Sequence, residues 1–153
     1  CSMIPVFQQV LHDPNAGQYG DCHRAAIATV LGLPPDDVPH FGFDDPPAPA
    51  FFNREREFLA RFNLYGATVP FSGELTDVLR TMSTLNGSDF VYLLGGKSPR
   101  GTNHTVVCRG DQIEHDPNPK GGGLVEPCSD GLWWLTFFVA ADLMKQARLE
   151  RTP

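Results

Sequence analysis

The chain contains 153 residues and carries 12 Lys and Arg against 18 Asp and Glu, a net charge of −6. This acidic balance argues against binding to nucleic acid or to an anionic membrane surface, because both require a basic footprint. The longest apolar run, 132–141, falls short of the roughly 20 residues of a membrane-spanning helix, and the chain does not begin with the pattern of a secretory signal. We therefore expect one soluble domain over residues 1–153, located in the cytoplasm.

The first half of the chain shows helix start signals and a helical spacing of apolar residues. Asp21, Asn53 and Ser72 are candidate N-caps, because their side chains can accept hydrogen bonds from the free N–H groups of a first helical turn. The elements expected here are helices over 22–31, 53–64 and 73–85, with a short strand over 67–71 before the third helix. Between the first two helices, the proline-rich stretch 34–49 predicts an extended connector, because proline pushes the preceding residue out of the helical region.

After residue 89 the pattern changes to short β-branched and aromatic runs, which are typical of strands. The expected elements are strands over 90–94, 104–108, 112–115 and 132–139, and a last helix over 141–150. The glycines at 95–96 and 121–123 lack the spacing of a phosphate-binding loop and are interpreted as turns, so no nucleotide or other cofactor is expected. Helices followed by an antiparallel sheet define the α+β class.

Cys22 stands at a chemically informative position, in the first turn of an almost wholly apolar helix and directly after Gly20-Asp21. The free N–H groups and the positive end of the helix dipole stabilise a thiolate there, and the same N–H groups can hold the oxyanion of a tetrahedral intermediate. This position predicts a nucleophile with a lowered pKa. The alternative is a buried thiol that serves as a small apolar core residue.

A thiol nucleophile needs a base and a third group that orients the base, and His104 and Asp116 stand at the two ends of a predicted hairpin. A two-residue turn at Gly110-Asp111 would place His115, and not Asp116, on the face of His104. A three-residue loop over 109–111 would pair His104 with Asp116. We expect the three-residue loop, a structural or rim position for His115, and surface or loop positions for the remaining histidines, His12, His23 and His40.

Several short motifs follow one another in a characteristic order. They are Gly20-Asp21-Cys22 at the start of an Ala-rich helix, Leu31-Gly32-Leu33, Val38-Pro39-His40-Phe41, Asn103-His104-Thr105-Val106-Val107 and His115-Asp116-Pro117-Asn118-Pro119. In this order the chain resembles papain-like cysteine hydrolases, and among them small phage and bacterial proteins akin to the leader peptidases of bacteriocin exporters. The resemblance covers about residues 4–125. It implies an α+β papain-like fold, with the nucleophile helix packed on a C-terminal antiparallel sheet, in a protein of a bacterial or phage-infected cytoplasm.

The resemblance also implies a catalytic triad of Cys22, His104 and Asp116 that attacks an amide, peptide or isopeptide bond through a thioester. It implies a glutamine in the oxyanion hole. The two candidates, Gln18 and Gln8, both depart from the family's usual spacing, and we prefer Gln18, the nearer one. We further predict that Tyr19, which follows Gln18, and Asn103, which precedes His104, bind the protein or peptide substrate. Where the family often has a small residue after the cysteine, this chain has His23.

Two other readings of the sequence stay open beside the enzyme. The first is a catalytically silent papain-like module that binds a host or partner protein through the Phe- and Pro-rich stretch 41–52. The second is a zinc-binding structural domain, which is disfavoured because the candidate ligands lack paired metal-ligand spacing; those ligands are Cys108, Cys128, His104 and His115. The sparse, irregularly spaced cysteines predict mostly reduced thiols. Trp133 and Trp134 face opposite sides of one strand, so that one belongs to the core and the other is available to a substrate groove.

Overall fold

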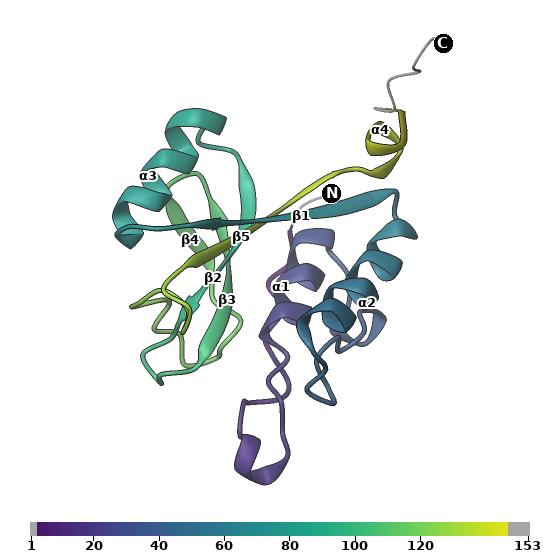
Figure 1. The fold of residues 1–153 in the computed structure, drawn as a ribbon, viewed down its shortest axis with the longest axis vertical. Helices are drawn as coiled ribbons and strands as arrows, with labels where there is room; N and C mark the ends of the chain where they lie inside the picture. Colours follow the sequence, from purple (N-terminus) through teal and green to yellow (C-terminus); the bar gives the residue numbers. More distant parts are fainter. Residues whose placement is uncertain (1–2, 147–153) are drawn as a thin grey trace.

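The computed structural model of the protein describes residues 3–146 (Figure 1). Its helices are α1 (Cys22–Leu31), α2 (Ala48–Ala60), α3 (Leu75–Asn86) and α4 (Ala141–Gln146), with short 3-10 turns at Pro14–Ala16 and Pro35–Asp37. Its strands are β1 (Leu64–Phe71), β2 (Val91–Lys97), β3 (Asn103–Arg109), β4 (Gln112–His115) and β5 (Trp133–Ala140). No helix in this part of the chain is long and apolar enough to cross a membrane. The end of the helix expected over 141–150 lies outside the described residues.

The strands form one antiparallel sheet in the order β1-β5-β2-β3-β4. The last strand of the chain is therefore inserted between the first and the second. Helices at the N-terminal side followed by a five-stranded antiparallel sheet confirm the α+β class expected from the sequence.

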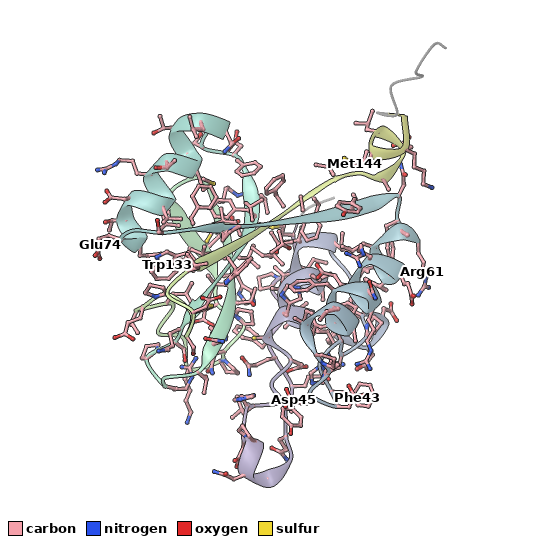
Figure 2. All side chains as sticks on the ribbon, in the orientation of Figure 1. Phe43, Asp45, Arg61, Glu74, Trp133 and Met144 are labelled. Carbon is pink, nitrogen blue, oxygen red and sulfur yellow. The ribbon has the colours of Figure 1, made fainter. Side chains whose placement is uncertain are left out.

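Helices cover both faces of the sheet (Figure 1), because the strands are apolar on both sides. On one face, α1 and α2 bury a cluster that includes Leu93 of β2 and Val107 of β3. On the other face, α3 covers Leu94 and Val106, the next residues along the same strands, together with Trp133 (Figure 2). This alternation follows from the two-residue period of a strand, and it fixes which side chains of β3 point toward α1.

The helix α2 begins five residues earlier than its sequence predicts, at Ala48 instead of Asn53. The expected extended connector is wrong over its last residues, because Pro49 occupies the first helical turn, where a missing N–H group breaks no helical hydrogen bond. Asn53 therefore lies inside α2 and does not cap it. The helix also ends before the predicted residue 64, at Ala60, because Leu64 already belongs to β1.

The predicted turn at 95–96 is also wrong, because both glycines continue β2 through Lys97. The absence of a side chain is required at Gly96, where a Cβ atom would lie 2.5 Å from the Trp133 ring. The third helix starts at Leu75, and Ser72 does not cap it.

The β3–β4 hairpin closes through the two-residue turn Gly110-Asp111, so the expected three-residue loop is wrong. The register then shifts by one residue within the hairpin, where Glu114 is the extra residue of a β-bulge. A shift by one residue exchanges the two faces of a strand. Because of the bulge, Asp116 lies on the same face of the hairpin as His104. With the two-residue turn and no bulge, Asp116 would lie on the opposite face.

Candidate active site

A cavity of about 500 Å³ lies where the start of β3 meets the N-terminus of α1. Both Cys22 and His104 line it. The other lining residues are Gln8, Gln9, Leu11, His12, Gly20, Arg100, Thr102, Asn103, Asn118, Pro119 and Lys120. Four segments of the chain thus build its wall: residues 8–12, 20–22, 100–104 and 118–120.

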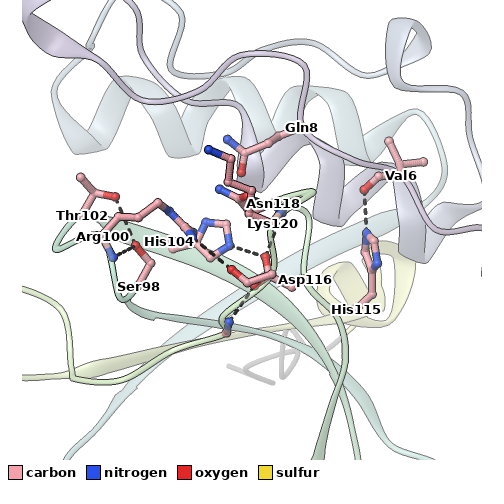
Figure 3. Close-up of polar contacts among 12 residues, drawn as sticks. Val6, Gln8, Ser98, Arg100, Thr102, His104, His115, Asp116, Asn118 and Lys120 are labelled. Carbon is pink, nitrogen blue, oxygen red and sulfur yellow. Dashed lines mark hydrogen bonds and ion pairs between the residues drawn. The ribbon is translucent and has the colours of Figure 1, made fainter.

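The structure brings His104 and Asp116 together, as the sequence predicts. Nε2 of His104 donates a hydrogen bond to Oδ1 of Asp116 at 2.7 Å (Figure 3). The carboxylate also accepts hydrogen bonds of 2.8 Å from the backbone N–H groups of Asn118 and Gly123. With Nε2 carrying the proton, Nδ1 of a neutral His104 is a free acceptor, and it has no hydrogen-bond partner among residues 3–146.

Burial and hydrogen bonding set the charge of this pair. Burial lowers the pKa of His104 from its ordinary value, and the neighbouring Asp116 only partly offsets that effect. Burial alone would raise the pKa of Asp116, but the hydrogen bonds from His104, Asn118 and Gly123 outweigh it and the pKa is lowered. At neutral pH the pair is therefore a neutral imidazole held by a carboxylate, which is the state a general base requires.

Cys22 is half-buried at the first position of α1, with its sulfur against β3 at Thr105. Burial raises the pKa of the thiol, and the nearby Asp21 carboxylate acts in the same sense. Hydrogen bonds from Thr105 and from the backbone of His23 oppose this shift without reversing it. The expected lowering of the pKa is thus wrong for this arrangement, because burial outweighs the helix terminus.

The thiol and the imidazole reach the cavity from opposite faces of β3. His104 pairs with Gly96 in the neighbouring strand, so the two residues share a face of the sheet. A Cβ atom at Gly96 would meet Trp133, which places this face on the α3 side. Thr105, the next residue, places its hydroxyl 3.4 Å from Nδ1 of His23 on α1. Within the described part of the chain, Cys22 and His104 share the wall of one cavity but form no hydrogen bond with each other.

His23 is not the surface or loop residue expected from the sequence. It lies on α1 with its ring packed edge-on against Phe51, at 5.3 Å between centroids. Its Nε2 is 3.4 Å from Oε2 of Glu55, without the geometry of a hydrogen bond. Glu55 is only 2% exposed, and its Oε1 has no partner in the described structure. A sequence signal for this pair exists, because Glu55 shares the apolar face of α2 with Phe51 and Phe58 at helical spacing.

Asp21 has a different role from the predicted N-cap. Its side chain makes no capping hydrogen bond to α1. Oδ1 instead accepts hydrogen bonds from the backbone N–H groups of Gln9 and Val10, at 3.0 and 2.9 Å, and Oδ2 pairs with Arg24. This buried carboxylate therefore holds the N-terminal segment against the start of α1, where that segment becomes a wall of the cavity.

The two candidate glutamines lie in different places relative to this segment and the cavity. Gln8 lines the cavity with Cys22, whereas Gln18 is exposed in a turn paired with Asp13 and does not line it. Of the two residues predicted to bind substrate, Asn103 lines the cavity and Tyr19 does not. The preference for Gln18 therefore does not agree with the geometry, since the sequence alone does not show that residues 8–12 return to the helix start.

The remaining histidines fall into two groups. His115 is buried, and its Nε2 donates a hydrogen bond of 2.7 Å to the backbone carbonyl of Val6, which confirms a structural position. His40, in a loop, likewise donates from Nε2 to the carbonyl of Tyr19 at 2.7 Å. His12 is exposed and lines the cavity, and its Nδ1 accepts a hydrogen bond from Gly20. Only His12 and His104 therefore offer imidazole groups to the cavity.

A second, larger cavity of about 610 Å³ lies between α2 and β1 and contains none of the predicted catalytic residues. Trp134 lines it, whereas Trp133 is 2% exposed in the core, as expected for two residues on opposite faces of a strand. Cys22, Cys108 and Cys128 are free thiols. In residues 3–146, no three His, Cys, Asp or Glu side chains gather as a metal site.

The chain matches no family model, no curated protein and no solved structure. Any assignment of function therefore rests on the residues of the site and on their geometry.

Proposed function

We propose that the protein is a cysteine-dependent acyl-transfer enzyme, with a papain-like arrangement, that cleaves an amide, peptide or isopeptide bond. Cys22 is the nucleophile, His104 is the base and Asp116 orients the base. The observation that carries the proposal is the buried His104–Asp116 hydrogen bond of 2.7 Å, on the wall of a cavity that Cys22 also lines. The free Nδ1 of His104 gives this pair an acceptor for the proton of a thiol.

The chemistry follows from these roles. The thiol of Cys22 turns from Thr105 toward His104, Nδ1 takes its proton, and the sulfur attacks the carbonyl carbon of the substrate. His104 then gives the proton to the leaving amine as the tetrahedral intermediate collapses to a thioester. Water activated by the same imidazole hydrolyses the thioester and restores the thiol; an amine in place of water would give transamidation.

Two groups are placed to stabilise the oxyanion. The backbone N–H of Cys22 belongs to the first turn of α1 and has no partner within the helix. Gln8 lines the same cavity, and its Nε2 uses one of two hydrogens for the carbonyl of Val10, at 3.0 Å. We therefore assign the supporting glutamine to Gln8.

The raised pKa of Cys22 and its separation from His104 favour a second candidate, a catalytically silent module that binds a protein partner. In the stretch 41–52, expected as its interface, half of the residues are exposed, but three of its four phenylalanines are buried or half-buried. Phe41 is 1% exposed in the core, and Phe51 and Phe52 belong to α2. Phe43, at 61% exposed, is the aromatic residue that this stretch still offers to a partner (Figure 2).

Alkylation by iodoacetamide, followed by peptide mapping, separates the two functions. An enzyme predicts that Cys22 reacts faster at neutral pH than Cys128, a half-buried thiol whose pKa burial raises to about 11. The variant His104→Ala should remove this advantage, since it removes the acceptor for the thiol proton. In Cys22→Ala, turnover of a peptide or glutamine substrate should be lost while the fold is retained.

The matched control is His12→Ala, which removes the other imidazole of the same cavity and should leave Cys22 reactive. If Cys22 is alkylated no faster than Cys128, or if His104→Ala does not change the alkylation rate of Cys22, the triad is wrong and the silent module takes its place. Turnover that persists in Cys22→Ala would also refute the triad, but it would point to another nucleophile and not to the silent module.

A further inference from the structure

The charge of the cavity differs from the charge of the whole chain. The protein has a net charge of −6, yet the charged residues that line this cavity are Arg100 and Lys120, beside His12 and His104. No Asp or Glu is among the described residues of its wall. Two carboxylates lie close to the site without lining the cavity. Asp116 is occupied by three hydrogen bonds, and Asp21, next to Cys22, is paired with Arg24.

Neither cation of the cavity is neutralised by the protein. Elsewhere in the described chain, carboxylates pair with Arg24, Arg54, Arg80, Lys97 and Arg109. Arg100 and Lys120 have no such partner within residues 3–146. In a protein with an excess of acidic residues, two unpaired cations at one cavity leave a local positive potential that a bound anion can satisfy.

A hydrogen bond holds the guanidinium of Arg100 at the edge of the cavity, and a second one fixes the main chain of Lys120 there. Nη1 of Arg100 donates a hydrogen bond of 3.0 Å to the carbonyl of Gly121, which joins the turn after β2 to the loop after β4. The backbone N–H of Lys120 donates to Oδ1 of Asn118 at 2.8 Å. Figure 3 shows Arg100 and Lys120 among the residues around His104, and both line the same cavity. The charge of Arg100 acts on this ring, since it contributes to lowering the pKa of His104.

From this arrangement we propose that the cavity selects a substrate with an anionic group, the carboxylate of an acidic peptide, next to the bond that Cys22 attacks. Arg100 and Lys120 bind this carboxylate, and the remaining guanidinium nitrogens of Arg100 are free to form paired hydrogen bonds with its two oxygens. The inference rests on the proposed function for the site of attack, but the positive potential of the cavity is testable without turnover.

The test compares two reagents that alkylate the same thiolate, iodoacetate with a negative charge and iodoacetamide with none. Their rate ratio at Cys22 cancels the fraction of thiolate, so it reports the potential of the cavity and not the pKa of the thiol. The ratio at Cys22 in the folded protein, at low ionic strength, should exceed the ratio in the denatured chain by about two- to five-fold. Added salt should reduce this excess.

Arg100→Gln and Lys120→Gln should each lower the ratio toward that of the denatured chain. Arg61→Gln and Lys145→Gln are matched controls, because they remove the same charge from exposed positions that do not line the cavity, and they should leave the ratio unchanged. A ratio equal to that of the denatured chain, or one indifferent to Arg100 and Lys120, overturns the proposal. So does a Cys22 that neither reagent reaches, since the cavity would not lead to the sulfur.

The two proposals fail in different ways. If His104→Ala does not slow alkylation of Cys22 but the iodoacetate-to-iodoacetamide ratio stays above that of the denatured chain, the triad is refuted and the anion site is retained. An intact His104 dependence with a ratio near that of the denatured chain refutes the anion site and leaves the triad. In the latter case, peptides that differ only by Glu against Gln beside the cleaved bond should be processed equally.

Discussion

At the scale of single residues, the site contains a feature that opposes folding. Glu55 is a carboxylate that the fold almost completely buries, and it has one long contact to His23 and an oxygen without a partner. Burial of a charged group without full compensation destabilises a protein. A chain of contacts runs from Glu55 through His23 and Thr105 to the sulfur of Cys22.

Replacement of Glu55 by an apolar residue of similar length should therefore stabilise the fold. We expect Glu55→Met to raise the free energy of unfolding by about 1–2 kcal/mol, as measured by urea denaturation. Glu57→Met, two residues away on the exposed side of α2, is the control and should change little. A loss of stability in Glu55→Met would mean that the carboxylate supports the structure itself.

At the scale of elements, the hairpin that carries His104 and Asp116 depends on the close approach of Gly110 to a neighbouring loop. Gly110 has φ 56°, and a Cβ atom there would lie 2.6 Å from the carbonyl oxygen of Ser88. The turn after β2 also contains a glycine of positive φ, Gly101 at 81°, but a Cβ atom at that position meets nothing within 4 Å. A side chain at Gly101 would therefore cause backbone strain alone, whereas a side chain at Gly110 would cause backbone strain and steric overlap.

Thermal and urea unfolding of Gly110→Ala and Gly101→Ala should show this separation. Gly101→Ala should cost about 1 kcal/mol, the price of a left-handed backbone for an L-residue. In Gly110→Ala the steric overlap adds to this strain, for a total of about 3 kcal/mol. Equal losses in the two variants would show that the hairpin can move away from Ser88.

The elements also show what the sequence could and could not reveal. The bounds of α1 follow from an apolar run that starts after Asp21 and stops at Gly32, and they are as predicted. The pairing of His104 with Asp116 was expected, but for the wrong reason, since a bulge at Glu114 leaves no local signal. Gln8 could not be chosen over Gln18 because its place depends on hydrogen bonds between distant segments, such as that from its N–H to the carbonyl of Pro117.

At the scale of the whole molecule, burial of His104 makes stability depend on pH. Its pKa in the folded protein is below the ordinary 6.5, so just below this pH the unfolded chain binds a proton that the folded protein does not. Stability is then highest above pH 6.5 and falls on acidification through that value. The lowered pKa of Asp116 acts in the same direction at lower pH, below its ordinary 3.8.

Urea midpoints measured across this range should fall from neutral pH toward pH 5. In His104→Gln the fall immediately below 6.5 should be reduced, whereas in His12→Gln, which alters an exposed imidazole, it should persist. A midpoint that stays constant between neutral pH and pH 5 in the parent protein would show that the imidazole is protonated without cost in the fold.

The strand order has a consequence for how the protein is made. β5 lies between β1 and β2, and it pairs along the whole of β1 from Phe71 to Leu64. On a ribosome, β1 and β2 emerge long before the strand that joins them, so their apolar edges stay open until residues 133–140 have left the exit tunnel. Biosynthesis thus leaves the edges of β1 and β2 that face β5 unpaired until β5 emerges, and during this interval they are open to pairing with other strands.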